Sequence, residues 1–80
     1  MAIGIEERIL ALISDQLDVE LDELKDEAFL ADDLGADPYD LDELASALNL
    51  EFNIDIDEEE IEQWGCVSDV IQTVMDNYEE

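Results

Sequence analysis

Residues 32–52, DDLGADPYDLDELASALNLEF, carry the strongest local signals for secondary structure in this chain of 80 residues. They predict a helix that begins directly after Asp37. Aspartate is favoured just before a helix because its carboxylate accepts hydrogen bonds from the free backbone N–H groups there. Pro38 suits the first helical position because the helix needs no N–H group from it. Asp40, three residues after Asp37, can accept from the backbone of Asp37 and complement the helix dipole.

Apolar residues recur at helical spacing after this start, and the same spacing appears twice more in the chain. Helices are predicted over residues 5–17, 38–52 and 67–77. A short helix over residues 57–63, with Asp57 as its cap, fits the remaining segment better than a strand would, because no partner strand is evident. We therefore expect an all-α bundle of three longer helices and one short helix, with a long first loop, forming a single domain over residues 1–80.

The helical stripes predict the core, and the long loop over residues 19–36 is expected to add anchors to it. The expected core residues are Ile9, Leu12, Ile13, Leu44, Leu48, Phe52, Val70, Ile71 and Val74. The expected anchors of the loop, which includes a short helical turn and a turn at Gly35, are Leu21, Leu24, Phe29, Leu30 and Leu34. Leu10 lies off the stripe of its helix and is expected to be exposed.

The charge of the chain narrows the classes of partner. The formal net charge is −24, with 26 acidic residues and only Arg8 and Lys25 as basic ones. Nucleic acid and insertion into a membrane are therefore unfavourable, and the basic surface of a protein partner is the natural complement. With no histidine and the single thiol of Cys66 in a negative field, the sequence predicts no enzyme. We expect a monomer in the cytoplasm, since nothing resembles a signal peptide and one cysteine permits no internal disulfide.

The motif DDLGAD at residues 32–37, the acidic helix ending in Glu51-Phe52 and the I-D-I segment at residues 54–56 resemble the acyl carrier protein family along nearly the whole chain. In that family an Asp-Ser-Leu motif carries 4′-phosphopantetheine on its serine. The corresponding positions here are Asp37, Pro38 and Tyr39. The resemblance therefore implies a divergent carrier domain without the attachment hydroxyl, and we expect no 4′-phosphopantetheine on the natural sequence.

The outer face of the predicted second helix is the expected partner surface, possessing an acidic flank and an aromatic residue. Family members usually have leucine, valine and methionine at the positions of Tyr39, Asp42 and Ser46, and these contact partner enzymes. Tyr39 is expected either to anchor a partner or to lie partly exposed over the loop. The complete set of predicted partner-binding residues is Asp37, Tyr39, Asp40, Asp42, Glu43, Ser46, Leu50 and Glu51.

Acidic residues also cluster at both ends of this helix, where family members bind divalent cations weakly. The candidate ligands are Asp32, Asp33, Asp37, Asp40, Glu51, Asp55 and Asp57. Neither acidic segment has the ligand spacing and glycine of an EF-hand. A diffuse solvated acidic surface is the alternative interpretation.

Three hypotheses of function follow. The first is an acidic protein–protein interaction module, linked to fatty acid or other acyl-thioester metabolism, that has lost the attachment serine. The second is a functional acyl carrier modified at another serine: Ser14, Ser46 or Ser68. The third is an acidic structural domain that responds to divalent ions.

Overall fold

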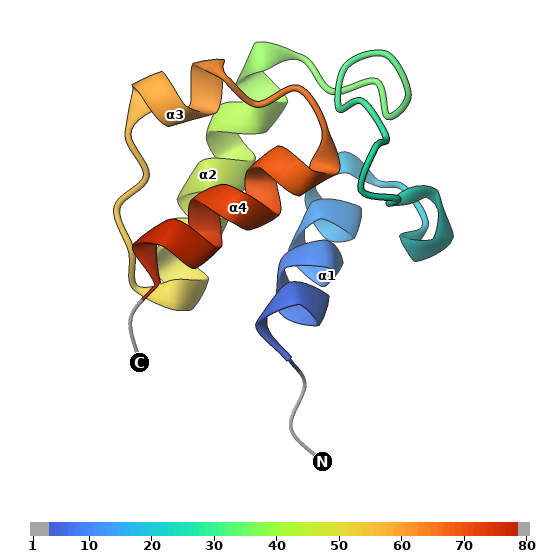
Figure 1. The fold of residues 1–80 in the computed structure, drawn as a ribbon. Helices are drawn as coiled ribbons and strands as arrows, with labels where there is room; N and C mark the ends of the chain where they lie inside the picture. The colour runs from blue at the N-terminus through green and yellow to red at the C-terminus, as the bar shows by residue number, and fades with distance from the viewer. Residues whose placement is uncertain (1–3, 79–80) are drawn as a thin grey trace.

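The computed structural model describes residues 4–78 and shows an all-α bundle (Figure 1). Its elements are α1 (Ile5–Leu17), the 3₁₀ turn η1 (Leu21–Glu23), α2 (Pro38–Phe52), α3 (Glu58–Glu62) and α4 (Val67–Asn77). α1 packs against α2 and α4, and α3 packs against α2. The predicted fold class of three longer helices and one short helix is confirmed. That residues 1–80 form a single domain stays a prediction.

The start of α2 follows from its first three residues together with its cap. The backbone N–H of Asp40 donates to Asp37 Oδ1 over 2.9 Å, and the N–H of Asp37 donates to Asp40 Oδ2 over 3.1 Å. This reciprocal pair satisfies two N–H groups near the helix start. Pro38 occupies the first helical position, where an N–H group would have no acceptor within the helix. At the other end, Asn53 adopts a left-handed conformation with φ of 55°, which asparagine tolerates at the end of a helix.

The core lies where the three longer helices meet. Its fully buried larger side chains are Ile9, Ile13, Leu30, Leu44, Leu48, Val67, Val70 and Val74. Phe52 is also buried as predicted. Leu12 and Ile71 were predicted to be core residues, but they are only partly buried and pack against this cluster. Trp64 was not expected in the core, but it is buried and its indole N–H donates to Thr73 Oγ1 over 2.9 Å. That bond satisfies the one polar group that the indole takes out of water.

The long loop is ordered by contacts with the start of α4. The N–H of Leu30 donates to the carbonyl oxygen of Gly65 over 2.9 Å, and the N–H of Val67 donates to that of Ala28 over 3.0 Å. Gly35, with φ of +72°, supplies the expected turn before α2. These bonds hold the loop beside α4, although its sequence has no regular periodicity.

The predictions for Leu10, Leu21 and Phe29 were also wrong. Leu24, Leu30 and Leu34 are buried as expected, but Leu21 is 59% exposed and Phe29 is 54% exposed. Leu10 was expected to be exposed, yet it is partly buried and packs against the core. The reason is that η1 folds back onto α1, so Leu10 and Leu21 line the same shallow hollow. The prediction for Leu10 failed because the apolar spacing within α1 gives no information about its neighbour Leu21 in η1.

Candidate docking surface on the second helix

The first helical residue of α2 is the position that the resemblance assigns to the attachment serine. Pro38 is exposed there and carries no hydroxyl group. The adjacent Tyr39 is 68% exposed and provides a phenol. The carboxylate of Glu43, one turn further along, raises the pKa of this phenol by hydrogen bonding and by its charge, with smaller contributions from Asp37 and Asp40. Tyr39 is therefore neutral at physiological pH.

The three serines lie in different surroundings. Ser14 is partly buried on α1, and its Oγ donates to the carbonyl oxygen of Val19. Ser68 is exposed in the first turn of α4, with its Oγ 3.1 Å from Cys66 Sγ. Ser46 is exposed on α2, eight residues after Pro38, which places it about 12 Å along the helix at 1.5 Å per residue. None of the three stands at the start of α2.

The outer face of α2 is exposed over its whole length. Leu50 is 86% exposed, and Asp42, Glu43, Ser46 and Glu51 are exposed as well. Asp37 is also exposed, whereas Asp40 is partly buried because it completes the cap of the helix. The structure thus presents the predicted partner residues on the surface of one helix. Their role in binding stays a prediction.

One acid of that face has an internal partner that the sequence did not reveal. Arg8 on α1 forms an ion pair with Glu51, the one such pair among residues 4–78. The Arg8 guanidinium also lies 4.7 Å from the centre of the Phe52 ring, and Phe52 meets Tyr78 edge to face. Half of the basic residues of the chain are therefore engaged at the C-terminal end of α2.

The predicted divalent-cation ligands do not form a compact set. Within the described part of the chain, no group of three or more acidic, cysteine or histidine side chains has an arrangement that could hold a metal ion. Several of the candidate carboxylates have structural roles instead. Asp37 and Asp40 cap α2, and Asp33 accepts from the N–H of Phe29 over 2.8 Å. A weak, diffuse attraction for cations stays a prediction.

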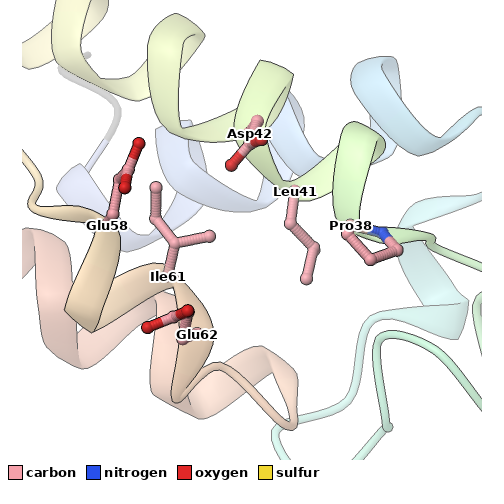
Figure 2. Close-up of a pocket in the computed structure, with 6 residues that line it drawn as sticks. All are labelled: Pro38, Leu41, Asp42, Glu58, Ile61 and Glu62. Atoms are coloured by element: carbon pink, nitrogen blue, oxygen red, sulfur yellow. The ribbon is translucent and has the colours of Figure 1, made fainter.

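A groove between the start of α2 and α3 was missed at the sequence level (Figure 2). Its volume is about 290 Å³, and it brings together residues separated by about twenty positions in the chain. The residues that line it are Pro38, Leu41, Asp42, Glu58, Ile61 and Glu62. Ile61 was the one apolar residue in an acidic segment, and this could have indicated that α3 turns a face toward α2.

The described helices include none that is long and apolar enough to span a bilayer.

Comparison with known proteins identifies the class to which this architecture belongs. Residues 7–74 match the family described as "Phosphopantetheine attachment site". An acyl carrier protein of Clostridium acetobutylicum is 40% identical over 74 residues, covering 92% of this chain and 96% of that protein. An acyl carrier protein of Nitratidesulfovibrio vulgaris is 41% identical over 71 residues, covering 89% and 93% respectively. The chain belongs to the phosphopantetheine-attachment family, as its resemblance to acyl carrier proteins indicated.

Acyl carrier proteins are carriers and not enzymes, so the prediction that this chain is not an enzyme is confirmed at the level of the family. The family normally holds 4′-phosphopantetheine through a serine oxygen. The side chains at the start of α2 do not fit that group, because Pro38 has no side-chain oxygen for the phosphodiester. The neighbouring Tyr39 has a phenol oxygen, but it is not a serine.

Proposed function

We propose that this domain is a carrier-protein relative that no longer attaches 4′-phosphopantetheine and instead acts as an acidic protein–protein interaction module. Its partner presents a basic surface, and an enzyme of fatty acid or other acyl-thioester metabolism is the expected kind of partner. The observation that carries the proposal is Pro38 at the first residue of an otherwise well-formed α2.

The scaffold around Pro38 supports a change of role rather than a decayed domain. The cap formed by Asp37 and Asp40 is complete, and Leu44 and Leu48 on the inner face of α2 are fully buried. Among the described residues, no buried side-chain nitrogen or oxygen lacks a hydrogen-bond partner. A helix that is well capped and well packed can present its outer face with little loss of conformational entropy on binding.

The charge of this surface suits a basic partner. With a net charge of −24, association with a positive surface is accelerated by long-range attraction and weakened by salt. Tyr39 and Leu50 add exposed apolar area to the same helix, and tyrosine is favoured at the centres of interfaces.

Intact mass spectrometry after coexpression with a promiscuous phosphopantetheinyl transferase tests the loss of the arm. We expect the natural chain to keep its unmodified mass. The matched control is the double variant Pro38→Ser with Tyr39→Leu, which rebuilds the Asp-Ser-Leu motif on the same capped helix. We expect this variant to gain the arm, because Asp37 still caps the helix and serine is tolerated in a first turn.

The outcomes of this experiment separate the hypotheses. Addition of the arm to the natural chain would overturn the proposal and favour a carrier modified at Ser14, Ser46 or Ser68. A folded double variant that stays unmodified would mean that Asp42 and Ser46 have also diverged from what the transferase recognises.

Affinity capture from the native cell tests the docking role, with Asp42→Asn and Glu43→Gln combined as the variant. The matched control is Glu6→Gln with Glu7→Gln, which removes the same charge from exposed positions on α1. We expect the α2 variant to capture the partner less well and the α1 variant to behave like the natural chain. Equal capture by both variants would contradict docking through α2, and an absence of any captured protein would favour the ion-responsive structural domain.

A further inference from the structure

The groove between α2 and α3 has an apolar floor and a charged rim. Leu41 and Ile61 are both partly buried and form the floor together with the ring of Pro38. Figure 2 shows Ile61 between Glu58 and Glu62 on α3, opposite Leu41 and Asp42 on α2.

The three rim carboxylates have no partner within the described residues. Asp42, Glu58 and Glu62 are exposed, and none of their side chains takes part in a hydrogen bond or ion pair that the described residues form. Their situation differs from that of Asp37 and Glu60, whose carboxylates cap helices. Arg8 cannot compensate them, because it is engaged with Glu51 at the other end of α2.

We infer that this groove receives one long cationic side chain, arginine or lysine, from the basic partner. This inference rests on the proposed function. The aliphatic stem lies along Leu41, Ile61 and Pro38, and the charged head lies among the rim carboxylates. Lysine and arginine combine an apolar stem with a charged end in this way. Hydrogen bonds between such a head and a carboxylate are stronger than those between neutral groups.

The size and the charge of the groove disfavour other occupants. Its volume of about 290 Å³ is at the small end of the range for ligand sites, so it suits a side chain better than a cofactor. An anionic ligand would meet three negative charges. A neutral apolar ligand could cover the floor, but it would remove water from the carboxylates without replacing the lost hydrogen bonds.

Backbone-amide NMR titrations at fixed ionic strength test the inference, with N-acetyl-arginine methylamide as the probe. N-acetyl-norleucine methylamide supplies an apolar stem without the charge, and methylguanidinium supplies the charge without the stem. We expect saturable shifts confined to the backbone amides of residues 39–42 and 58–62 with the arginine probe, and a several-fold weaker response to each of the other two.

Two pairs of variants locate the binding. Glu58→Gln with Glu62→Gln removes two rim charges, and Asp55→Asn with Glu59→Gln removes two exposed charges close by that do not line the groove. We expect the first pair to weaken the arginine probe by roughly two- to tenfold, as for loss of two exposed ion pairs, and the second by less than about twofold. Ile61→Ser tests the floor against Leu50→Ser, which changes an apolar residue outside the groove.

Several results would overturn the inference. They are equal responses to the arginine and norleucine probes, equal responses to the arginine probe and methylguanidinium, or shifts spread evenly over the acidic surface. If the natural chain keeps its unmodified mass but the amides around the groove do not shift with the arginine probe, only this inference fails. If the natural chain gains the arm, the proposed function fails whatever the titration shows.

Discussion

Asp69 allows the contribution of local capping to be separated from that of the overall charge. Its carboxylate accepts from the N–H of Gly65 over 2.8 Å and from the N–H of Cys66 over 3.1 Å, which caps the start of α4. These two backbone donors lower the pKa of Asp69, and desolvation opposes them only in part. Asp69 is the third residue of α4, and its carboxylate reaches back to the backbone of the Cys66 cap.

The expected cost of Asp69→Asn at neutral pH is about 1–2 kcal/mol of unfolding free energy. Loss of a helix cap costs about 0.5–2 kcal/mol, and a hydrogen bond to a charged group is worth about 1.5–3 kcal/mol. The amide retains one acceptor oxygen, and removal of one negative charge from a highly negative chain relieves some repulsion. Both effects keep the loss below the sum of two charged hydrogen bonds.

The pH dependence provides the sharper test. Because the folded pKa of Asp69 is lowered, its contribution to stability is fully present above the unfolded value of about 3.9 and disappears as the pH falls through the folded pKa. The difference between the natural chain and Asp69→Asn should therefore be constant from about pH 7 to 5 and should shrink below about pH 4.

Urea unfolding monitored by circular dichroism, repeated across this pH range, measures that difference. The control is Asp26→Asn, which removes one charge from an exposed loop side chain and keeps the backbone carbonyl of Asp26, which accepts from the N–H of Ser68 over 3.1 Å. A stability difference for Asp69→Asn that stays constant down to about pH 2, or one no larger than that of Asp26→Asn, would refute the assigned capping role.

Three further predictions follow from the packing and charge. Leu48→Ala should lower the unfolding free energy by about 2–5 kcal/mol in urea denaturation, because Leu48 is fully buried; a change below about 0.5 kcal/mol would place it at the surface. Arg8→Gln should cost about 1 kcal/mol by losing the Glu51 pair and the Phe52 ring contact, and less at high salt; a cost equal to that of Lys25→Gln would contradict this. Added salt should raise the melting temperature by screening repulsion, and calcium should match sodium chloride of equal ionic strength if no defined site forms.

The helices could be predicted because their determinants are local. Asp37, Pro38 and Asp40 specify the start of α2 within four residues, and the apolar spacing of α1 and α4 gives their bounds directly. The loop could not be predicted in the same way. Whether Leu21 or Leu24 enters the core depends on how η1 meets α1, and that is decided by contacts between elements.

The exposed face of α2 was predictable for the same reason as the helix itself. The groove was not, because Leu41 and Ile61 come from different elements and share no periodicity. The pairing of Arg8 with Glu51 was also hidden, since the two residues lie 43 positions apart. Sequence reasoning therefore predicted one helix surface and missed what its neighbours add to it.

The backbone bonds between the long loop and the start of α4 bear on how the chain meets proteases. Eighteen residues rich in exposed acids would normally be an open target for an enzyme that cleaves after glutamate. Here the N–H of Leu30 and the carbonyl oxygen of Ala28 are bonded to Gly65 and Val67, so these two backbone groups are not free to pair with a protease while the contact with α4 holds. Cleavage between these residues therefore requires their contact with the start of α4 to open first, and it depends on how often that contact opens.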